Sequence, residues 1–424
     1  MNPPEKLRLA GSPAGSAAPL APHLPERREP LQADTSWLKA LDGFLDGLIN
    51  FFSSLRLTVV CLGIGLVLVF CGTLAQVDLG LYKAQNEYFR SFVVFWGPKG
   101  ATWRIPVLPG GYLVGGVLLL NLIASHFRRF RFSRDKVGIW MVHVGLILLL
   151  LGQLLTDVLA RESSLHLREG EARNYSEADR QCELAVIDTT QSDADTVVAI
   201  PQGRLMNEGE IQNDALPFVV RVNRFYVNSQ LADRGNDTNA PVAASQGLGP
   251  GLVVKDLPRV TEMDRRDVPS AVVEILTPQG SLGTWLVSEY LDRPQSFSYD
   301  HRSYDLVLRP LRYYKPFSIR LQQFRHDVYP GTDIPKNFSS RVLLQRADTG
   351  ESREVLIYMN NPLRYAGETF YQASFDTDNH GSILQVVHNP SWLTPYFACV
   401  LVGTGLLLHF VMHLFGFTFR RRTA

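Results

Sequence analysis

The sequence predicts an integral membrane α-helical bundle of four transmembrane helices, with a large β-rich, sandwich-like domain between the third and fourth helices. Three observations lead to this fold class. Apolar residues are concentrated in four blocks, each close to the roughly 20 residues that a helix needs to cross the hydrocarbon core. Basic residues gather in the short flanks on one side of these blocks. The stretch between the third and fourth blocks consists of short alternating runs separated by turn residues, which is typical of antiparallel β structure.

The segment ahead of the first apolar block divides into two parts. Residues 1–33 are rich in Pro, Ala and Gly, which predicts a disordered cytoplasmic tail. Residues 34–56 predict an amphipathic helix lying in the inner membrane interface, although a helix packed against the bundle fits the same pattern. Its apolar side chains recur at helical spacing and are Trp37, Leu41, Phe44, Leu45, Leu48, Ile49 and Phe52. Because so long a segment precedes the first block, we interpret that block as an uncleaved anchor rather than a signal peptide.

The four spans are predicted at residues 57–76, 107–125, 137–159 and 394–417. Each must be helical, because lipid offers no hydrogen-bond partner to an unpaired backbone group. The second span starts near Pro109, a helix-start signal, and carries one amide, Asn121, that we expect to be buried.

Basic residues orient the bundle. The link at residues 126–136 contains five of them, and the tail at residues 418–424 contains Arg420, Arg421 and Arg422. Both segments should be cytoplasmic. The sequence therefore predicts a plasma (inner) membrane protein with both termini in the cytoplasm. The link at residues 77–106 and the domain at residues 160–393 are then periplasmic. Aromatic residues in the first of these suit an interfacial segment or the lining of an apolar groove.

The outer domain shows strand patterns but no catalytic motif. Clear examples are residues 184–187, 218–222, 271–275, 304–308 and 355–358. Residues 228–258, rich in Gly, Ala and Asp, predict a long mobile excursion. This domain has no Gly-rich phosphate loop, no paired-His metal motif and no GxSxG, so no catalytic residue is assigned.

Charge and cysteine usage exclude further classes. A net charge of +1, without a basic stretch interleaved with aromatics, gives no sign of a nucleic-acid partner. The four cysteines form no CxxC, so the chain is neither a dithiol reductase nor a haem acceptor. Cys182 is the only cysteine of the outer domain and is expected to be a buried, inert thiol.

Histidines in the spans are the main candidates for chemistry. His143 lies within the third span, where an ionisable side chain is costly and marks a functional-site hypothesis. It could ligate haem iron or another metal, or hydrogen-bond a neighbouring helix. His409 and His413 are four residues apart and share one helical face, which suits a metal pair or polar contacts between helices. His143 and His413 each lie about 10 Å from the inner boundary, so they could share one haem if the two spans touch. His166 and His388 should lie near the outer surface.

Three stretches together resemble the ResB (also called CcsB) family of cytochrome c maturation proteins. They are SLRLTVV at residues 54–60 with GTLAQ at 72–76, VHVGL at 142–146 with LHLREGE at 165–171, and MNNPLRYAGETFYQASF at 359–375. The order of three spans, an outer domain and a last span also matches.

The resemblance implies a part in the System II pathway of cytochrome c biogenesis. There the chain would work with a ResC/CcsA-like partner to move non-covalent haem b across the membrane and support its attachment to apocytochrome c. The family's intramembrane histidine corresponds to His143, whereas His409 and His413 lie outside the pattern. The six tryptophans are scattered, so the tryptophan-rich haem-presenting motif must belong to the partner. The chain would then be a non-catalytic or co-catalytic subunit of a holocytochrome c synthase.

A competing interpretation has no haem. In it, the chain is a membrane-anchored periplasmic scaffold of a respiratory or transport complex, which the absence of a catalytic motif favours and His143 opposes. A sensor that signals through the bundle is a third interpretation, but the cytoplasmic segments offer little to receive a signal.

Overall fold

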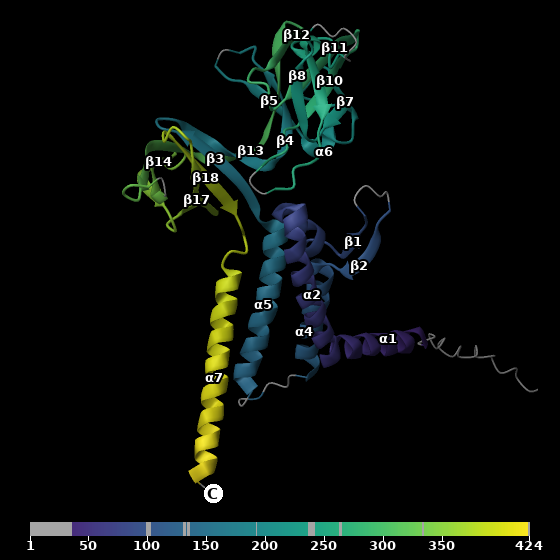
Figure 1. The fold of residues 1–424 in the computed structure, drawn as a ribbon, viewed down its shortest axis with the longest axis vertical. Helices are drawn as coiled ribbons and strands as arrows, with labels where there is room; N and C mark the ends of the chain where they lie inside the picture. Colours follow the sequence, from purple (N-terminus) through teal and green to yellow (C-terminus); the bar gives the residue numbers. More distant parts are fainter. Residues whose placement is uncertain are drawn as a thin grey trace, which may run out of the picture. The chain divides into compact units, whose positions relative to one another are not determined.

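The computed structural model describes residues 36–98, 103–129, 133, 136–191, 193–235, 242–262, 265–332 and 335–422 (Figure 1). The predicted disordered tail at residues 1–33 and parts of the basic link at residues 126–136 lie outside these ranges. The chain divides into a unit of residues 1–50 and a unit of residues 51–424.

Helix α1 (Ser36–Phe52) stands where the amphipathic helix is predicted. Its large apolar side chains are exposed to solvent over the part that lies in the first unit, including Leu41, Phe44 and Leu48. An exposed apolar face suits a helix that lies in a membrane interface. That location stays a prediction.

Four helices of the described residues are long and apolar enough to cross a membrane. They are α2 (Leu55–Leu79), α4 (Gly111–Arg129), α5 (Val137–Leu159) and α7 (Thr394–Arg422). The four predicted spans are thus confirmed as helices, with differences at their ends. Helix α4 begins at Gly111 and not at residue 107, because residues 107–109 belong to a strand. Helix α7 continues through most of the segment predicted as a tail.

The link between α2 and α4 folds into α3 (Leu81–Ala84), the π-helix η1 (Gln85–Phe89) and an antiparallel pair, β1 (Val93–Trp96) with β2 (Ile105–Pro109). The Phe89 ring lies against Gly72 of α2, where an added Cβ would come within 2.8 Å of the ring. One aromatic side chain of the link therefore packs onto the first span.

Asn121 joins two spans through its amide. Thr58 Oγ1 donates to Asn121 Oδ1 at 2.6 Å, and Asn121 Nδ2 donates to the carbonyls of Phe52 and Ser54 at 2.5 and 3.0 Å. The side chain is buried, as the sequence predicts. These bonds satisfy polar groups that lipid could not, and they fix α4 against the start of α2.

Helices α5 and α7 pack antiparallel along a line of glycines spaced by seven residues. A Cβ on Gly138 would lie 2.6 Å from the carbonyl oxygen of Gly405, and one on Gly145 would lie 3.0 Å from that of Ala398. Gly152 faces Thr394 at the other end of the line. Only glycine admits such close backbone approach, which is how helices pack without a hydrophobic driving force in lipid.

The β-rich region predicted between the third and fourth spans is confirmed, and most of its strands form one ten-stranded sheet (Figure 1). The order is β15-β14-β13-β4-β3-β18-β17-β16, with β12 on β13 and β5 on β4. These strands are β3 (Arg161–Arg168), β4 (Ala172–Asp188), β5 (Thr196–Pro201), β12 (Gln295–Tyr299), β13 (Arg302–Val328), β14 (Pro335–Arg346), β15 (Glu351–Tyr358), β16 (Leu363–Tyr365), β17 (Glu368–Phe375) and β18 (Gly381–His388).

A second sheet has the order β11-β10-β7-β6. It consists of β6 (Gly209–Ile211), β7 (Val219–Tyr226), β10 (Ser270–Thr277) and β11 (Gly280–Ser288), and the short helix α6 (Gln202–Leu205) precedes it. The predicted excursion at residues 228–258 is wrong in part, because it contains the paired strands β8 (Ser229–Asp233) and β9 (Leu252–Asp256) with the 3-10 helix η3 (Gly249–Gly251). Asn228 fixes its base, since its side chain donates to the carbonyl of Pro258 at 2.6 Å.

Two hydrophobic clusters form the interior of this region. One takes side chains from both sheets, among them Leu184, Val273 and Leu306. The other lies within the ten-stranded sheet, among them Leu165, Ile319 and Phe370. Strand β13, with 27 residues, and its partner β4, with 17, run from one half into the other. The domain therefore has two halves joined by two long strands, which the sequence pattern does not predict.

Candidate functional site

His143 lies in the first third of α5, as expected. Its Nδ1 is 2.8 Å from the carbonyl oxygen of Ile139, one turn earlier in the helix. A carbonyl can only accept, so Nδ1 carries the proton and Nε2 carries the lone pair that can bind iron. This arrangement fixes both tautomer and ring orientation, as in many metal-binding histidines.

A second histidine, His126, lies beside this position on α4. Its ring centroid is 5.4 Å from that of Trp140. An imidazole of α4 and an indole of α5 thus meet between these two helices, with His143 one helical turn after Trp140. Sequence reasoning missed His126 because the second span was predicted to end at residue 125, whereas α4 continues to Arg129. The apolar Phe127 beside it was the available signal for a longer helix.

His409 and His413 lie together on α7, with ring centroids 4.4 Å apart. The packing of α5 against α7 places both histidines at a different depth from His143. Gly138 meets the backbone at Gly405 and His409, and Gly145 meets it at Ala398 and Val402, so His143 is level with about Val402. At 1.5 Å per residue, His409 is then displaced by about 10 Å and His413 by about 16 Å. The prediction that His143 and His413 share a depth is wrong, and a ligand role for the α7 pair stays a prediction.

The histidines of the β-rich domain are dispersed. His166 Nε2 bonds with Asp376 at 2.9 Å, and His326 stacks with Phe338 at 5.1 Å between centroids. His388 lines a cavity at the end of β18 nearest to α7.

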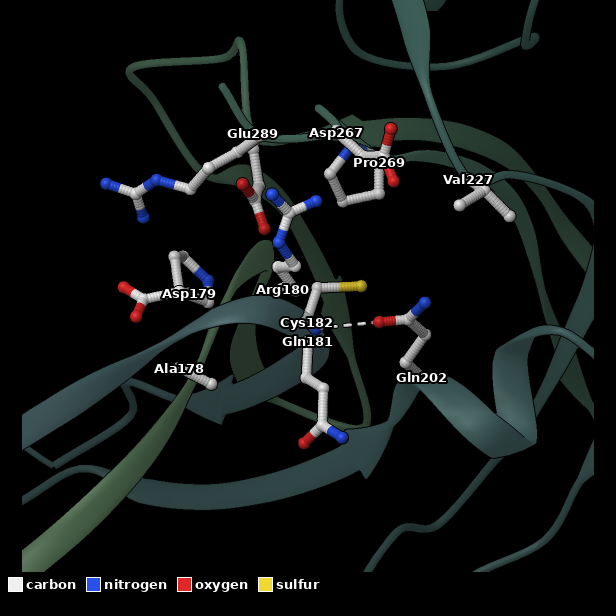
Figure 2. A pocket seen from close by; sticks show the side chains of 12 residues that line it. Ala178, Asp179, Arg180, Gln181, Cys182, Gln202, Val227, Asp267, Pro269 and Glu289 are labelled. Atoms are coloured by element: carbon white, nitrogen blue, oxygen red, sulfur yellow. Dashed lines mark hydrogen bonds between the residues drawn. The ribbon is translucent and has the colours of Figure 1, made fainter. Parts of the chain in front are cut away.

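Cys182 lies in a small cavity where the two halves of the β-rich domain join (Figure 2). Its backbone N–H donates to Oε1 of Gln202 at 3.0 Å. Burial raises the pKa of the thiol to about 12. The predicted burial of Cys182 is confirmed, and because the thiolate is the reactive form, the raised pKa agrees with the predicted lack of reactivity. Burial also raises the pKa of Glu289, which lines the same cavity, to about 7. In the described ranges, no group of three or more His, Cys, Asp and Glu side chains could hold a metal ion.

Comparison with known proteins agrees with the resemblance found in the sequence. Residues 283–383 match the ResB-like family. The chain therefore contains a ResB-like segment. It is also similar to protein NrfI of Wolinella succinogenes, with 26% identity over 296 residues, which cover 69% of this chain. The aligned part is only 29% of the length of NrfI, so this ResB-like chain spans less than a third of that relative.

The matched segment of the ResB-like chain has a definite place in the fold. It begins in β11 and ends in β18, and so includes the β16–β17 hairpin formed by the motif at residues 359–375. Leu363 and Phe370 of this motif are buried in the second cluster. Ala366 and Gly367 have φ of 49° and 79° and make its two-residue turn. Part of the motif therefore builds the hairpin.

Proposed function

We propose that this ResB-like chain works in cytochrome c biogenesis, where it holds haem at His143 within the membrane. A ResC/CcsA-like partner would carry haem onward to apocytochrome c on the side of the β-rich domain. In this proposal that side is the periplasm and both termini are cytoplasmic, as the basic flanks predict.

The observation that carries the proposal is the geometry of His143. An imidazole inside a span, with Nδ1 donating to the carbonyl of Ile139, would use Nε2 to ligate haem iron. Trp140 precedes it by one helical turn, and most residues of α5 are apolar, as the faces of a porphyrin require. Haem is cargo here, and the chain's own residues bind and orient it.

The rest of the chain supports a carrier and not a catalyst. The single thiol of the β-rich domain is buried with a raised pKa, so it offers no nucleophile. Attachment of haem to a cytochrome then depends on the acceptor's thiols and on the proximity that the complex provides.

The test is an absorption spectrum of the chain purified with its ResC-like partner, for the wild type and for His143→Gly. Loss of the axial ligand should lower bound haem to about a tenth or less, and added imidazole should restore it, because the glycine leaves room for the free ligand. His301→Gly is the matched control, because His301 lies in an exposed turn of the β-rich domain with a φ of 58° that glycine adopts, and it should keep its haem.

Two results would contradict the proposal. Unchanged haem in His143→Gly removes His143 from the site. Absence of haem from the wild-type complex, with the complex intact, favours the scaffold without haem.

A further inference from the structure

The second hydrophobic cluster occupies one half of the β-rich domain. Ionisable side chains border the core of that half. Alternate residues of a strand point to one face of its sheet. On β17, Glu368 lies next to the buried Phe370 on the core face. On β18, His388 lies next to the buried Val386 on the same face. On β3 the same row runs from Leu165 to Arg161.

Strand β13 shows the same pattern. Tyr313 and Lys315 precede Phe317 on the face that holds the core. The register confirms the row, because Glu368 pairs with His388 and His388 pairs with Arg161 across adjacent strands. Ionisable residues therefore stand at positions where the alternation calls for apolar ones. Charges at inward positions are costly and are kept where they serve a ligand.

These side chains line a solvent-open cavity of about 280 Å³, which we call the inner-face chamber. Its lining comprises Arg161, Ser163, Arg312, Tyr313, Tyr314, Glu368 and His388, with Lys315 directly behind Glu368. All these residues belong to the ten-stranded sheet.

The charges of the inner-face chamber do not balance. Lys315 Nζ donates to Glu368 Oε1 at 2.7 Å, and Arg312 Nε pairs with Glu177 at 3.1 Å. Arg161 has no ion-pair partner among the residues that the structure describes, and it lies 5.4 Å from the centroid of the Tyr313 ring. Burial lowers the pKa of Lys315, and the positive charge of Arg161 lowers it further against the opposing effect of Glu368. One positive charge is therefore in excess.

An incomplete hydrogen-bond network accompanies this charge. Glu368 Oε2 is buried and has no hydrogen-bond partner in the described part of the chain. Buried polar groups are nearly always satisfied, so this atom points to a molecule that the chain does not supply, and the exposed Arg161 offers it a positive charge in the same cavity. An acidic group would pair with Arg161, while a hydroxyl, a protonated acid or water would donate to Glu368.

Chain connections place the chamber at the membrane boundary. Arg161 follows the end of α5 by two residues, and His388 precedes α7 by six. A second cavity of about 410 Å³ shares Glu368 and is lined by Trp392 and Tyr396. Arg364 lies over the Trp392 ring at 4.2 Å. Tryptophan and tyrosine at this depth suit the apolar part of a molecule that is half in lipid.

We propose that the inner-face chamber binds the acidic group, carboxylate or phosphate, of an amphiphile at the membrane surface, with Arg161 as its main cation. Two molecules carry this chemistry there: a porphyrin with its propionates, and an anionic phospholipid. The porphyrin case rests on the proposed function, since haem would then pass this chamber on its way outward.

The test uses the full-length protein in phosphatidylcholine nanodiscs. Metal-free protoporphyrin IX is titrated and its fluorescence anisotropy measured, with its dimethyl ester as the probe that lacks free acids. Short-chain phosphatidic acid is measured in parallel by native mass spectrometry. The protein variants are Arg161→Gln, Arg161→Lys and Arg168→Gln. The last is the matched control, because Arg168 ends the same strand β3 and pairs with Asp378.

At least one acidic probe should bind the wild type. Arg161→Gln should weaken that binding by about tenfold or more, the usual effect of removing a charged hydrogen bond. Arg161→Lys, which keeps the charge, should bind more tightly than Arg161→Gln, and Arg168→Gln should match the wild type. Binding of the porphyrin but not its ester identifies the propionates, and binding of phosphatidic acid alone identifies the lipid.

The proposal is overturned if neither acid binds, or if both Arg161 variants, with unfolding temperatures like the wild type, bind as the wild type does. Because protoporphyrin IX contains no iron, it cannot report on axial ligation. Repeating the titration with His143→Gly therefore separates this inference from the proposed haem site.

Discussion

Glu289 shows how one buried carboxyl can set a pH dependence. Burial near Cys182 raises its pKa from 4.5 to about 7. A raised pKa means that the folded chain binds the proton more tightly than the unfolded chain does. The resulting stabilisation is complete below about pH 4.5 and is lost as the pH rises through about 7.

Replacement of Glu289 by Gln should remove this dependence. At pH 8 the variant should be more stable than the wild type by up to roughly 3 kcal/mol, from 1.36 kcal/mol per pKa unit. Thermal unfolding of the full chain in detergent between pH 5 and 8 measures the effect. Glu274→Gln is the control, because hydrogen bonding by Ser281 and the nearby Arg221 lower that pKa. A wild-type stability that stays flat over this range would count against the raised pKa.

Cys182 offers a second test at the same cavity. With a pKa of about 12, roughly one thiol in 30,000 is ionised at pH 7.5. In a variant with Cys61, Cys71 and Cys399 changed to Ala, maleimide should label native protein over hours and denatured protein within minutes. Rapid labelling of the native protein would show that the cavity opens.

The glycine line of α5 makes a prediction at the scale of the helix pair. An alanine at Gly138 would place Cβ 2.6 Å from the Gly405 carbonyl and 2.7 Å from the His409 nitrogen, so α5 and α7 must move apart. We expect Gly138→Ala to lower the free energy of unfolding by about 1–3 kcal/mol.

Gly63 of α2 is the matched control. Nothing lies within 4 Å of a Cβ at Gly63, so alanine there should be neutral or stabilising through its helix propensity. Unfolding temperatures in detergent compare the two variants. Equal effects would show that close packing of α5 on α7 does not stabilise the bundle.

Among the elements, the spans were predictable and their ends were not. Hydropathy measures whether about twenty consecutive residues are apolar enough to lie in lipid, which is a local property of the sequence. The start of α4 depends on the β1–β2 pair, and its end on contacts around His126 and Trp140. Those contacts join residues that are distant in sequence, so no local pattern contains them.

At the scale of the whole molecule, strands such as residues 271–275 could be predicted but their arrangement could not. Alternation shows which face of a strand is apolar. It does not show where β13 leaves one half of the domain and enters the other, because the same alternation continues through both halves. His143 was predictable because a histidine in a span is conspicuous. The inner-face chamber was not, since Glu368, His388 and Arg161 become neighbours only through the register of β17, β18 and β3.

The antiparallel contact of α5 with α7 also has a consequence for biosynthesis. Residues 160–393 lie between the two helices in the sequence. The ribosome therefore synthesises the entire β-rich domain after α5 and before α7. At 5–20 residues per second this takes roughly 10–50 s. During that interval, Gly138, Gly145 and Gly152 of α5 have no partner helix from their own chain and face lipid or another protein of the membrane.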